Sequence, residues 1–177
     1  MFDMFFPDRY AVSAYVIDFE KLYERGYRGV IFDIDNTLVP HGAPADERAV
    51  RLFKRLKEIG FACCLISNNQ EPRVKMFNEK IQTDYVYNAH KPSTKNYRKA
   101  MEIMGTDMDT TVFVGDQLFT DVWGAKRSGI ASILVKPIHP KEEIQIVLKR
   151  YLERIVLFFY KRSLRMEKKV EKRHHLL

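Results

Sequence analysis

The sequence contains very little cysteine and no long apolar run. Only two of its 177 residues are cysteines, Cys63 and Cys64, and they are adjacent within a short apolar stretch. Neighbouring residues of a strand point to opposite faces, so these thiols are not expected to pair and indicate buried, reduced cysteines. No stretch approaches the roughly 20 apolar residues that cross a bilayer, and the N-terminus lacks the basic start of a signal peptide. We therefore expect a cytoplasmic protein.

The composition is that of a globular protein with an uneven charge. Hydrophobic residues make up 46% of the chain and charged residues 30%, and the length suits one domain with a substantial core. The net charge is +7, and residues 149–173 contain ten Lys or Arg against three Glu. Most of the positive excess therefore lies near the C-terminus. Zinc-type ligand spacing is absent, and no motif for nucleic-acid binding is recognised, so we expect no nucleic-acid partner.

Strand and helix patterns alternate along most of the chain. Runs rich in β-branched and aromatic residues predict strands at about residues 29–33, 61–66, 84–87, 111–114 and 130–135. Helical patterns occur at about residues 18–25, 46–59, 72–79, 92–104 and 121–128, with a last helix from about Lys141. This alternation predicts an α/β fold in three layers, with a parallel sheet of about five strands covered by helices on both faces.

Two carboxylates follow the first of these strands. The run Val30–Phe32 leads directly into Asp33, and Asp35 comes two residues later. Alternation along an extended chain puts both carboxylates on one side, at the edge where open α/β sheets bind ligands. Because the two charges repel, this arrangement requires a cation or a shared proton. The alternative is that both are turn residues that close a loop after a core strand.

Polar residues also follow three other apolar runs. Ser67 follows the second strand, Lys91 follows the third, and Asp116 with Asp121 follows the fourth. Taken singly, each has an ordinary structural alternative: a turn serine, a surface lysine, a strand-end turn or a helix cap. Taken together they predict one site, because the carboxyl ends of parallel strands meet at the same edge of the sheet.

These residues resemble the four motifs of the haloacid dehalogenase (HAD) superfamily of phosphohydrolases, in order. The matching elements are Asp33-x-Asp35-x-Thr37, Ser67, Lys91-Pro92, and Gly115-Asp116-Gln117 with Asp121. The resemblance implies a Rossmann-like HAD core with the strand order 3-2-1-4-5, and phosphatase chemistry through an aspartyl phosphate. The second aspartate of the first motif is absent from the dehalogenases of the superfamily, which favours a phosphatase.

Within this resemblance, four side chains are expected to be catalytic. Asp33 would be the nucleophile, and Asp35 would protonate the leaving oxygen and then activate water. Ser67 would donate a hydrogen bond to the phosphoryl group, and Lys91 would bring positive charge to it.

The resemblance also implies a magnesium site and further substrate contacts. Oxygen ligands alone suit Mg²⁺ rather than zinc. The expected metal-binding residues are Asp33, Asp35 through its backbone carbonyl, Asp116 and, through bound water, Asp121. Thr37 and Asn68 are expected to contact the substrate.

The spacing of the motifs leaves no room for an inserted lid domain. Only 29 residues separate Thr37 from Ser67, and 23 separate Ser67 from Lys91. We therefore expect an open site without a cap, which favours a large or surface-bound phosphate ester over a small metabolite that must be enclosed.

The C-terminal helix is expected to be basic and amphipathic. Its apolar stripe comprises Ile144, Val147, Leu148, Tyr151, Ile155, Phe158 and Phe159. Such a helix could lie on an anionic membrane at the inner face, pack on the sheet, or form an oligomer contact. We thus expect three segments: an N-terminal arm with a short helix (1–28), the HAD core (29–140) and this helix (141–177).

The first motif and the Gly-Asp-Gln-Leu-Phe-Thr-Asp run together resemble the capless YqeG-type subfamily of class IIIA HAD phosphatases, which is similar to phosphatidylglycerophosphate phosphatases. The favoured substrate by resemblance is phosphatidylglycerophosphate at a membrane surface. The alternatives are a soluble HAD phosphatase that acts on a metabolite, a phosphoprotein or a nucleic-acid phosphate, and a non-enzymatic interaction module.

Overall fold

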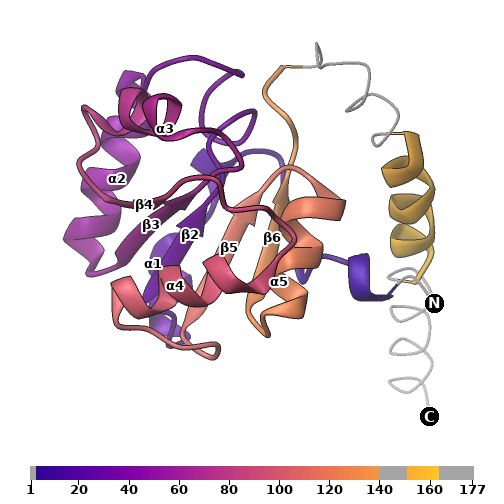
Figure 1. The fold of residues 1–177 in the computed structure, drawn as a ribbon. Coiled ribbons are helices and arrows are strands. Elements are labelled where there is room, and N and C mark those ends of the chain that lie inside the picture. Colours follow the sequence, from indigo (N-terminus) through magenta and orange to yellow (C-terminus); the bar gives the residue numbers. More distant parts are fainter. Residues whose placement is uncertain (1–2, 140–150, 164–177) are drawn as a thin grey trace.

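A computed structural model describes residues 3–139 and 151–163 of the chain. Its centre is a parallel sheet of six strands in the order β1-β6-β5-β2-β3-β4 (Figure 1). The strands are β1 (Arg9–Ala11), β2 (Gly29–Phe32), β3 (Ala62–Ile66), β4 (Asp84–Val86), β5 (Thr111–Gly115) and β6 (Ala131–Val135). The five predicted strands are all present in the expected order, so the α/β fold is confirmed, and β1 is an additional edge strand.

The central strand β2 explains why the fold needs helices on both faces. All four of its residues are buried. Val30 and Phe32 pack with one core and Ile31 with the other, as expected for a strand covered on both sides. Helices α1 (Phe19–Glu24), α2 (Glu47–Ile59) and α3 (Glu71–Asn78) contribute to the first core, and α4 (Thr94–Met104) and α5 (Trp123–Arg127) contribute to the second.

Helix α2 begins and ends where its sequence signals predict. The Asp46 side chain accepts a hydrogen bond from the Ala49 backbone N–H at 2.9 Å and so caps the first turn. At the other end Gly60 adopts a left-handed conformation with φ of 107°, which glycine adopts without the steric strain of a side chain. The chain then turns directly into β3.

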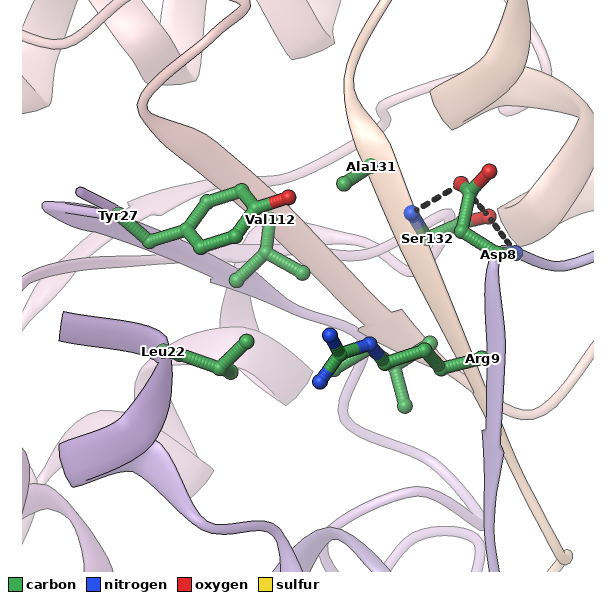
Figure 2. A pocket seen from close by; sticks show the side chains of 8 residues that line it. Asp8, Arg9, Leu22, Tyr27, Val112, Ala131 and Ser132 are labelled. Carbon is green, nitrogen blue, oxygen red and sulfur yellow. Dashed lines mark hydrogen bonds between the residues drawn. The ribbon is translucent and has the colours of Figure 1, made fainter. Parts of the chain in front are cut away.

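Strand β1 is held at the sheet edge by one aspartate that precedes it. The Asp8 carboxylate accepts hydrogen bonds from the backbone N–H and the hydroxyl of Ser132, at 2.8 and 2.9 Å (Figure 2). Lys126 pairs with the same carboxylate. A small pocket lined by Arg9 and Tyr27 lies beside this contact, where β5 and β6 begin. It is therefore at the opposite end of the strands from the predicted site.

The segment after β5 differs from the single helix predicted for residues 121–128. A π-helical turn, η3 (Leu118–Val122), comes first, and α5 follows. Asp121 lies within this wider turn, and its carboxylate accepts hydrogen bonds from the backbone N–H groups of Asp116 and Gln117 at 3.1 and 3.0 Å. The widened turn thus folds an acidic side chain back onto the end of β5, a local irregularity that is frequent at functional sites.

Residues 151–163 are helical and pack at the side of the domain that carries η3 and β6 (Figure 1). Val156 and the carboxylate of Glu153 are buried against the domain. The described residues of the predicted apolar stripe, Tyr151, Ile155, Phe158 and Phe159, are instead 42–65% exposed. The stripe therefore faces outward here. The residues predicted to extend it, Ile144, Val147 and Leu148, and the basic tail lie outside the described residues.

Across the described part of the chain, no helix has both the length and the apolar character that a membrane span requires.

Candidate active site

The predicted motif residues gather at one edge of the sheet. Asp33 follows β2, Ser67 follows β3 and Asp116 follows β5. Lys91 lies in the loop after β4, and its side chain reaches back across the ends of the strands to Asp33. Because all these strands are parallel, their carboxyl ends lie side by side, as the sequence predicted.

Asp33 is the centre of a buried cluster. Its carboxylate Oδ1 lies 2.6 Å from Lys91 Nζ, and the same ammonium lies 2.7 Å from Asp121 Oδ1. The Thr37 hydroxyl donates to Asp116 Oδ1 at 3.1 Å and lies 3.5 Å from Asp33 Oδ2. Thr37 was expected to contact substrate, and in this structure its hydroxyl ties two of the carboxylates together.

The charges of this cluster do not balance. Carboxylate oxygens of Asp33, Asp116 and Asp121 all lie within 4.8 Å of one another and are buried. Burial raises the pKa of the Asp33 carboxyl, Lys91 opposes the rise, and the charge of Asp121 adds to it. Burial would lower the pKa of Lys91, but Asp121 and Asp33 outweigh it and raise that pKa, so the lysine is cationic. One ammonium thus faces three carboxylates.

This donor set fits a divalent cation. Buried like charges at short range repel strongly unless a cation lies among them, and a cluster made of carboxylate oxygens alone suits hard Mg²⁺ rather than zinc. Asp33, Asp116 and Asp121 are three of the four residues predicted to bind metal. The fourth, Asp35, was predicted to do so through its backbone carbonyl, and its side chain is not part of the cluster.

Asp35 is in a different environment, although it lies only two residues from Asp33. Its carboxylate accepts hydrogen bonds from Asn69 Nδ2 at 2.7 Å, from the Gly42 N–H at 2.8 Å and from Arg73 Nη2 at 2.9 Å. The Asp35 side chain is 13% exposed. The two aspartates are thus held apart by separate sets of partners, and Asp35 faces the loop after β3 and the first turn of α3.

Asn69 and Arg73 were missed in the sequence. Asn69 follows the predicted pair Ser67-Asn68, and its backbone N–H donates to Ser67 Oγ at 3.1 Å. Arg73 lies in the first turn of α3, the helix that follows β3 after a short loop. Both could have been predicted from their position just after the strand that carries Ser67. A helix that begins at the carboxyl end of that strand faces the edge of the sheet where the motif residues lie.

Asn68 was expected to contact substrate, and it also has a structural contact. Its side-chain carbonyl accepts a hydrogen bond from the backbone N–H of Lys91 at 2.7 Å. This bond joins the loop after β3 to the loop that carries the lysine. Ser67 itself is buried, and its hydroxyl oxygen accepts hydrogen bonds from the backbone N–H and the side-chain amide of Asn69.

The turn that carries Asp121 depends on a glycine of the fourth motif and on a contact that the motifs did not reveal. A Cβ added at Gly115 would lie 2.5 Å from Asp121 Oδ2, so only glycine fits beneath the carboxylate. On the far side of the turn, the buried carboxylate of Glu153 accepts a hydrogen bond from the Leu118 N–H at 2.8 Å. The helix of residues 151–163 therefore helps to hold the turn that carries Asp121.

Comparisons with known proteins identify the family of the chain. A family model described as HAD-hydrolase-like matches residues 88–137. The Bacillus subtilis protein named "Probable phosphatase YqeG" is 38% identical over 160 residues, which cover 90% of this chain and 93% of that protein. The chain belongs to the YqeG-type family of HAD phosphatases. The phosphatase class predicted from the motifs is therefore confirmed.

One more distant relative and one solved structure extend the comparison. The chloroplastic and mitochondrial phosphatidylglycerophosphate phosphatase 1 of Arabidopsis thaliana is 28% identical over 84% of this chain and 45% of its own length. Among solved structures, the deoxy-D-mannose-octulosonate 8-phosphate phosphatase of Haemophilus influenzae superposes with a TM-score of 0.50 at 15% identity, over 65% of this chain and 70% of its own. The second likeness supports the fold alone.

Proposed function

We propose that this HAD phosphatase is a Mg²⁺-dependent phosphomonoester hydrolase that works through an aspartyl phosphate, with phosphatidylglycerophosphate as its substrate. The observation that carries the mechanism is the separation of the two aspartates of the first motif. Asp33 lies in a buried cluster with Lys91 and two further carboxylates, whereas Asp35 is held outside that cluster by Asn69, Arg73 and Gly42.

Asp33, Asp116 and Asp121 would hold the metal ion, with the backbone carbonyl of Asp35 as the proposed fourth contact. When bound, Mg²⁺ offsets the repulsion between a carboxylate nucleophile and an anionic phosphate ester. Thr37 supports this role because its hydroxyl fixes Asp116 at 3.1 Å. Asp121 is fixed in turn by two backbone N–H groups.

In the first step, a carboxylate oxygen of Asp33 attacks phosphorus and the bond from phosphorus to the ester oxygen breaks. Asp35 gives a proton to the departing oxygen, which leaves as an alcohol. In the second step, water attacks the same phosphorus and loses its proton to Asp35. The bond between Asp33 and phosphorus then breaks, inorganic phosphate leaves and the Asp33 carboxylate is restored.

Lys91 and Ser67 stabilise the transferring group. The Lys91 ammonium lies against the nucleophile and is cationic, so it can bind the phosphoryl oxygens where negative charge increases. The buried Ser67 hydroxyl supplies a hydrogen bond at the end of the neighbouring strand. We also propose that Thr37 and Asn68 border the substrate, in addition to their structural contacts.

A lipid substrate is supported by the relative, the topology and the surface. The Arabidopsis relative is named as a phosphatidylglycerophosphate phosphatase. Within the described residues no cap element is inserted between the strands that carry the motifs, so a headgroup can approach the site from outside. The described C-terminal helix exposes Phe158 and Ile155 beside basic residues such as Arg154, a composition that suits the surface of an anionic membrane at its inner face.

The test is phosphate release from phosphatidylglycerophosphate in mixed micelles, compared with a panel of soluble phosphate esters, with and without Mg²⁺. We expect Mg²⁺-dependent release from the lipid that is lost in Asp33→Asn. Release from soluble esters alone would retain the mechanism and contradict the lipid substrate. No release from any ester would contradict both and favour a binding module.

A further inference from the structure

Arg73 has more hydrogen-bonding capacity than the free protein uses. Its guanidinium is largely enclosed, with 14% of the side chain exposed, and Nη2 lies 2.9 Å from Asp35 Oδ1. The other two guanidinium nitrogens, Nε and Nη1, are buried and have no hydrogen-bond partner within the described residues. One of three nitrogens is thus paired, at a position next to an aspartate of the first motif.

An incompletely paired buried guanidinium needs an explanation. Buried donors without acceptors destabilise a protein, and the loss is larger when the group is charged. Arg73 is not required to keep Asp35 in place, because Asn69 Nδ2 and the Gly42 N–H hold both oxygens of that carboxylate at 2.7 and 2.8 Å. The arginine can therefore leave Asp35 without releasing it.

The place of Arg73 indicates which part of a ligand it would meet. In the proposed mechanism Asp35 contacts the ester oxygen that leaves, and Arg73 is hydrogen-bonded to Asp35, which is not a member of the Asp33 cluster. It is therefore next to the alcohol portion of the substrate rather than the transferring phosphoryl group. A planar guanidinium with free N–H groups is suited to paired contacts with a phosphate or carboxylate.

We propose that Arg73 forms a subsite for a second anionic group, carried on the alcohol portion of the substrate. This inference rests on the proposed function, because it takes Asp35 as the neighbour of the leaving oxygen. On binding, the long side chain rotates from its enclosed position so that the unpaired nitrogens meet the second anion. The enzyme would then discriminate between monoesters by the charge of the group that leaves.

Two kinds of substrate would satisfy such a subsite. A phosphodiester three carbons from the monoester, as in the headgroup of phosphatidylglycerophosphate, presents two anionic oxygens. A carboxylate on a small phosphorylated acid presents the same chemistry. Both sources can be tested without a membrane, which separates this inference from the lipid substrate itself.

The experiment measures kcat/KM for three soluble monoesters: glycerol 3-phosphate, 3-phosphoglycerate and the deacylated headgroup glycerophosphoglycerophosphate. The variants are Arg73→Gln and Arg73→Lys. Lys75→Gln is the matched control. Lys75 lies on the same helix and is 61% exposed, and its replacement by glutamine removes the same positive charge as Arg73→Gln. Each variant is also titrated with the non-hydrolysed diester glycerophosphoglycerol as a competitive inhibitor.

We expect wild type to favour a substrate with a second anion, and Arg73→Gln to reduce that preference by about 10-fold or more. Turnover of glycerol 3-phosphate also falls in this variant, so the ratio between substrates is the decisive quantity. Arg73→Lys should restore part of the ratio, and Lys75→Gln should leave it unchanged. Preference for the headgroup over the phosphorylated acid would assign the subsite to a phosphodiester, and the reverse to a carboxylate.

An unchanged ratio in Arg73→Gln, with all three substrates slowed equally, would overturn the inference and leave Arg73 as a residue that only positions Asp35. Unaltered inhibition by the diester would overturn it as well. Because these assays use soluble esters, they remain decisive even if the lipid is not a substrate. Lipid turnover with an unchanged ratio would contradict the subsite alone.

Discussion

Asp33 and Asp35 are separated by one residue, yet the fold gives them opposite surroundings. Asp33 is 6% exposed and lies among Lys91 and two further carboxylates. Asp35 accepts three hydrogen bonds from an amide, a guanidinium and a backbone N–H, and none of these donors is part of the other cluster. The comparison teaches that one strand end can supply two carboxylates with different surroundings when neighbouring loops provide different partners.

The difference is produced by the order of the strands. Strand β2 lies between β5 and β3, so the residues after it meet the acidic turn beyond β5 on one side and the amide-rich loop beyond β3 on the other. Asp33 is joined through Lys91 to Asp121 from the first of these, and Asp35 is joined to Asn69 from the second. The order of the strands therefore brings different partners to the two aspartates, and the proposed roles rest on that difference.

The largest expected effect on activity comes from replacing Asp33, the proposed nucleophile in the acidic cluster. Asp33→Asn should lower kcat by at least about 10⁴-fold on every ester, because the amide cannot replace a carboxylate nucleophile. The fold should persist, since Lys91 keeps its contact with Asp121. Steady-state kinetics and thermal unfolding together check this, with the exposed Asp109→Asn as a matched control. Residual turnover within 10-fold of wild type would be incompatible with a nucleophilic Asp33.

Asp35→Asn should cause a smaller loss of activity, and the size of that loss should depend on the leaving group. Removal of a general acid costs about 10²–10⁴-fold, and the loss should be greatest for alkyl phosphates, whose alkoxides are poor leaving groups. For p-nitrophenyl phosphate, whose nitrophenolate leaves without protonation, the decrease in the rate of the first step should be much smaller. Pre-steady-state kinetics on both esters checks the contrast. Equal losses on the two esters would remove the distinction drawn between the aspartates.

The next effect concerns the turn that supplies Asp121 to the acidic cluster. Glu153→Ala deprives the buried Leu118 N–H of its acceptor, which should lower the free energy of unfolding by about 1–3 kcal/mol. Because the turn also carries a proposed metal-binding residue, the dissociation constant for Mg²⁺ should rise by roughly 10-fold.

Urea unfolding and calorimetric Mg²⁺ titration measure these two changes. Glu153→Gln retains a carbonyl acceptor and should recover most of the affinity, and Leu152→Ala, at an exposed position of the same helix, should change neither quantity. Normal Mg²⁺ affinity in a destabilised Glu153→Ala protein would show that the helix supports the fold without supporting the site.

The smallest effect is expected at an aspartate outside both clusters. Burial would raise the pKa of Asp8, but hydrogen bonds from Lys126 and Ser132 outweigh it and lower the pKa. A depressed folded-state pKa stabilises the protein above the unfolded-state value, and the contribution is lost as pH falls through the folded value.

Asp8→Asn should therefore lower Tm by about 1–3 °C at pH 7, and the difference from wild type should vanish in acid. Differential scanning calorimetry at pH 7 and below pH 4 checks the trend. kcat should not change, because Asp8 lies at the opposite end of the strands from the site. A stability difference that grows in acid would contradict the assigned direction of the shift.

The sequence predicted the sheet and the motif residues well because both depend on local patterns. Five apolar runs mark the strands, and four of them are followed by a polar motif, so the motif residues meet at one edge once the strands are parallel. The order of the strands came from the family resemblance. Strand β1 was missed because a three-residue edge strand has too short a pattern, and its position depends on the distant contact between Asp8 and Ser132. The partners Arg73 and Glu153 were missed for the same reason, since each meets its target only after the helices have packed.

The outward-facing side of residues 151–163 was also not predictable from periodicity. Phe158 and Ile155 mark the apolar stripe by sequence, but the helix packs on the domain through Val156 and Glu153 instead. On the packed face, Glu153 accepts a hydrogen bond from the buried Leu118 N–H. That feature belongs to the tertiary structure.

The central claim, that Asp33 receives the phosphoryl group while Asp35 does not, is tested most directly by trapping the intermediate. Wild-type enzyme is mixed with a ³²P-labelled ester and Mg²⁺, quenched in acid within one turnover, and either counted or reduced with borohydride, which converts an aspartyl phosphate to homoserine. The account predicts acid-stable label and homoserine at position 33, and neither in Asp33→Asn. Label on another residue, or full turnover without any labelled protein, would contradict it.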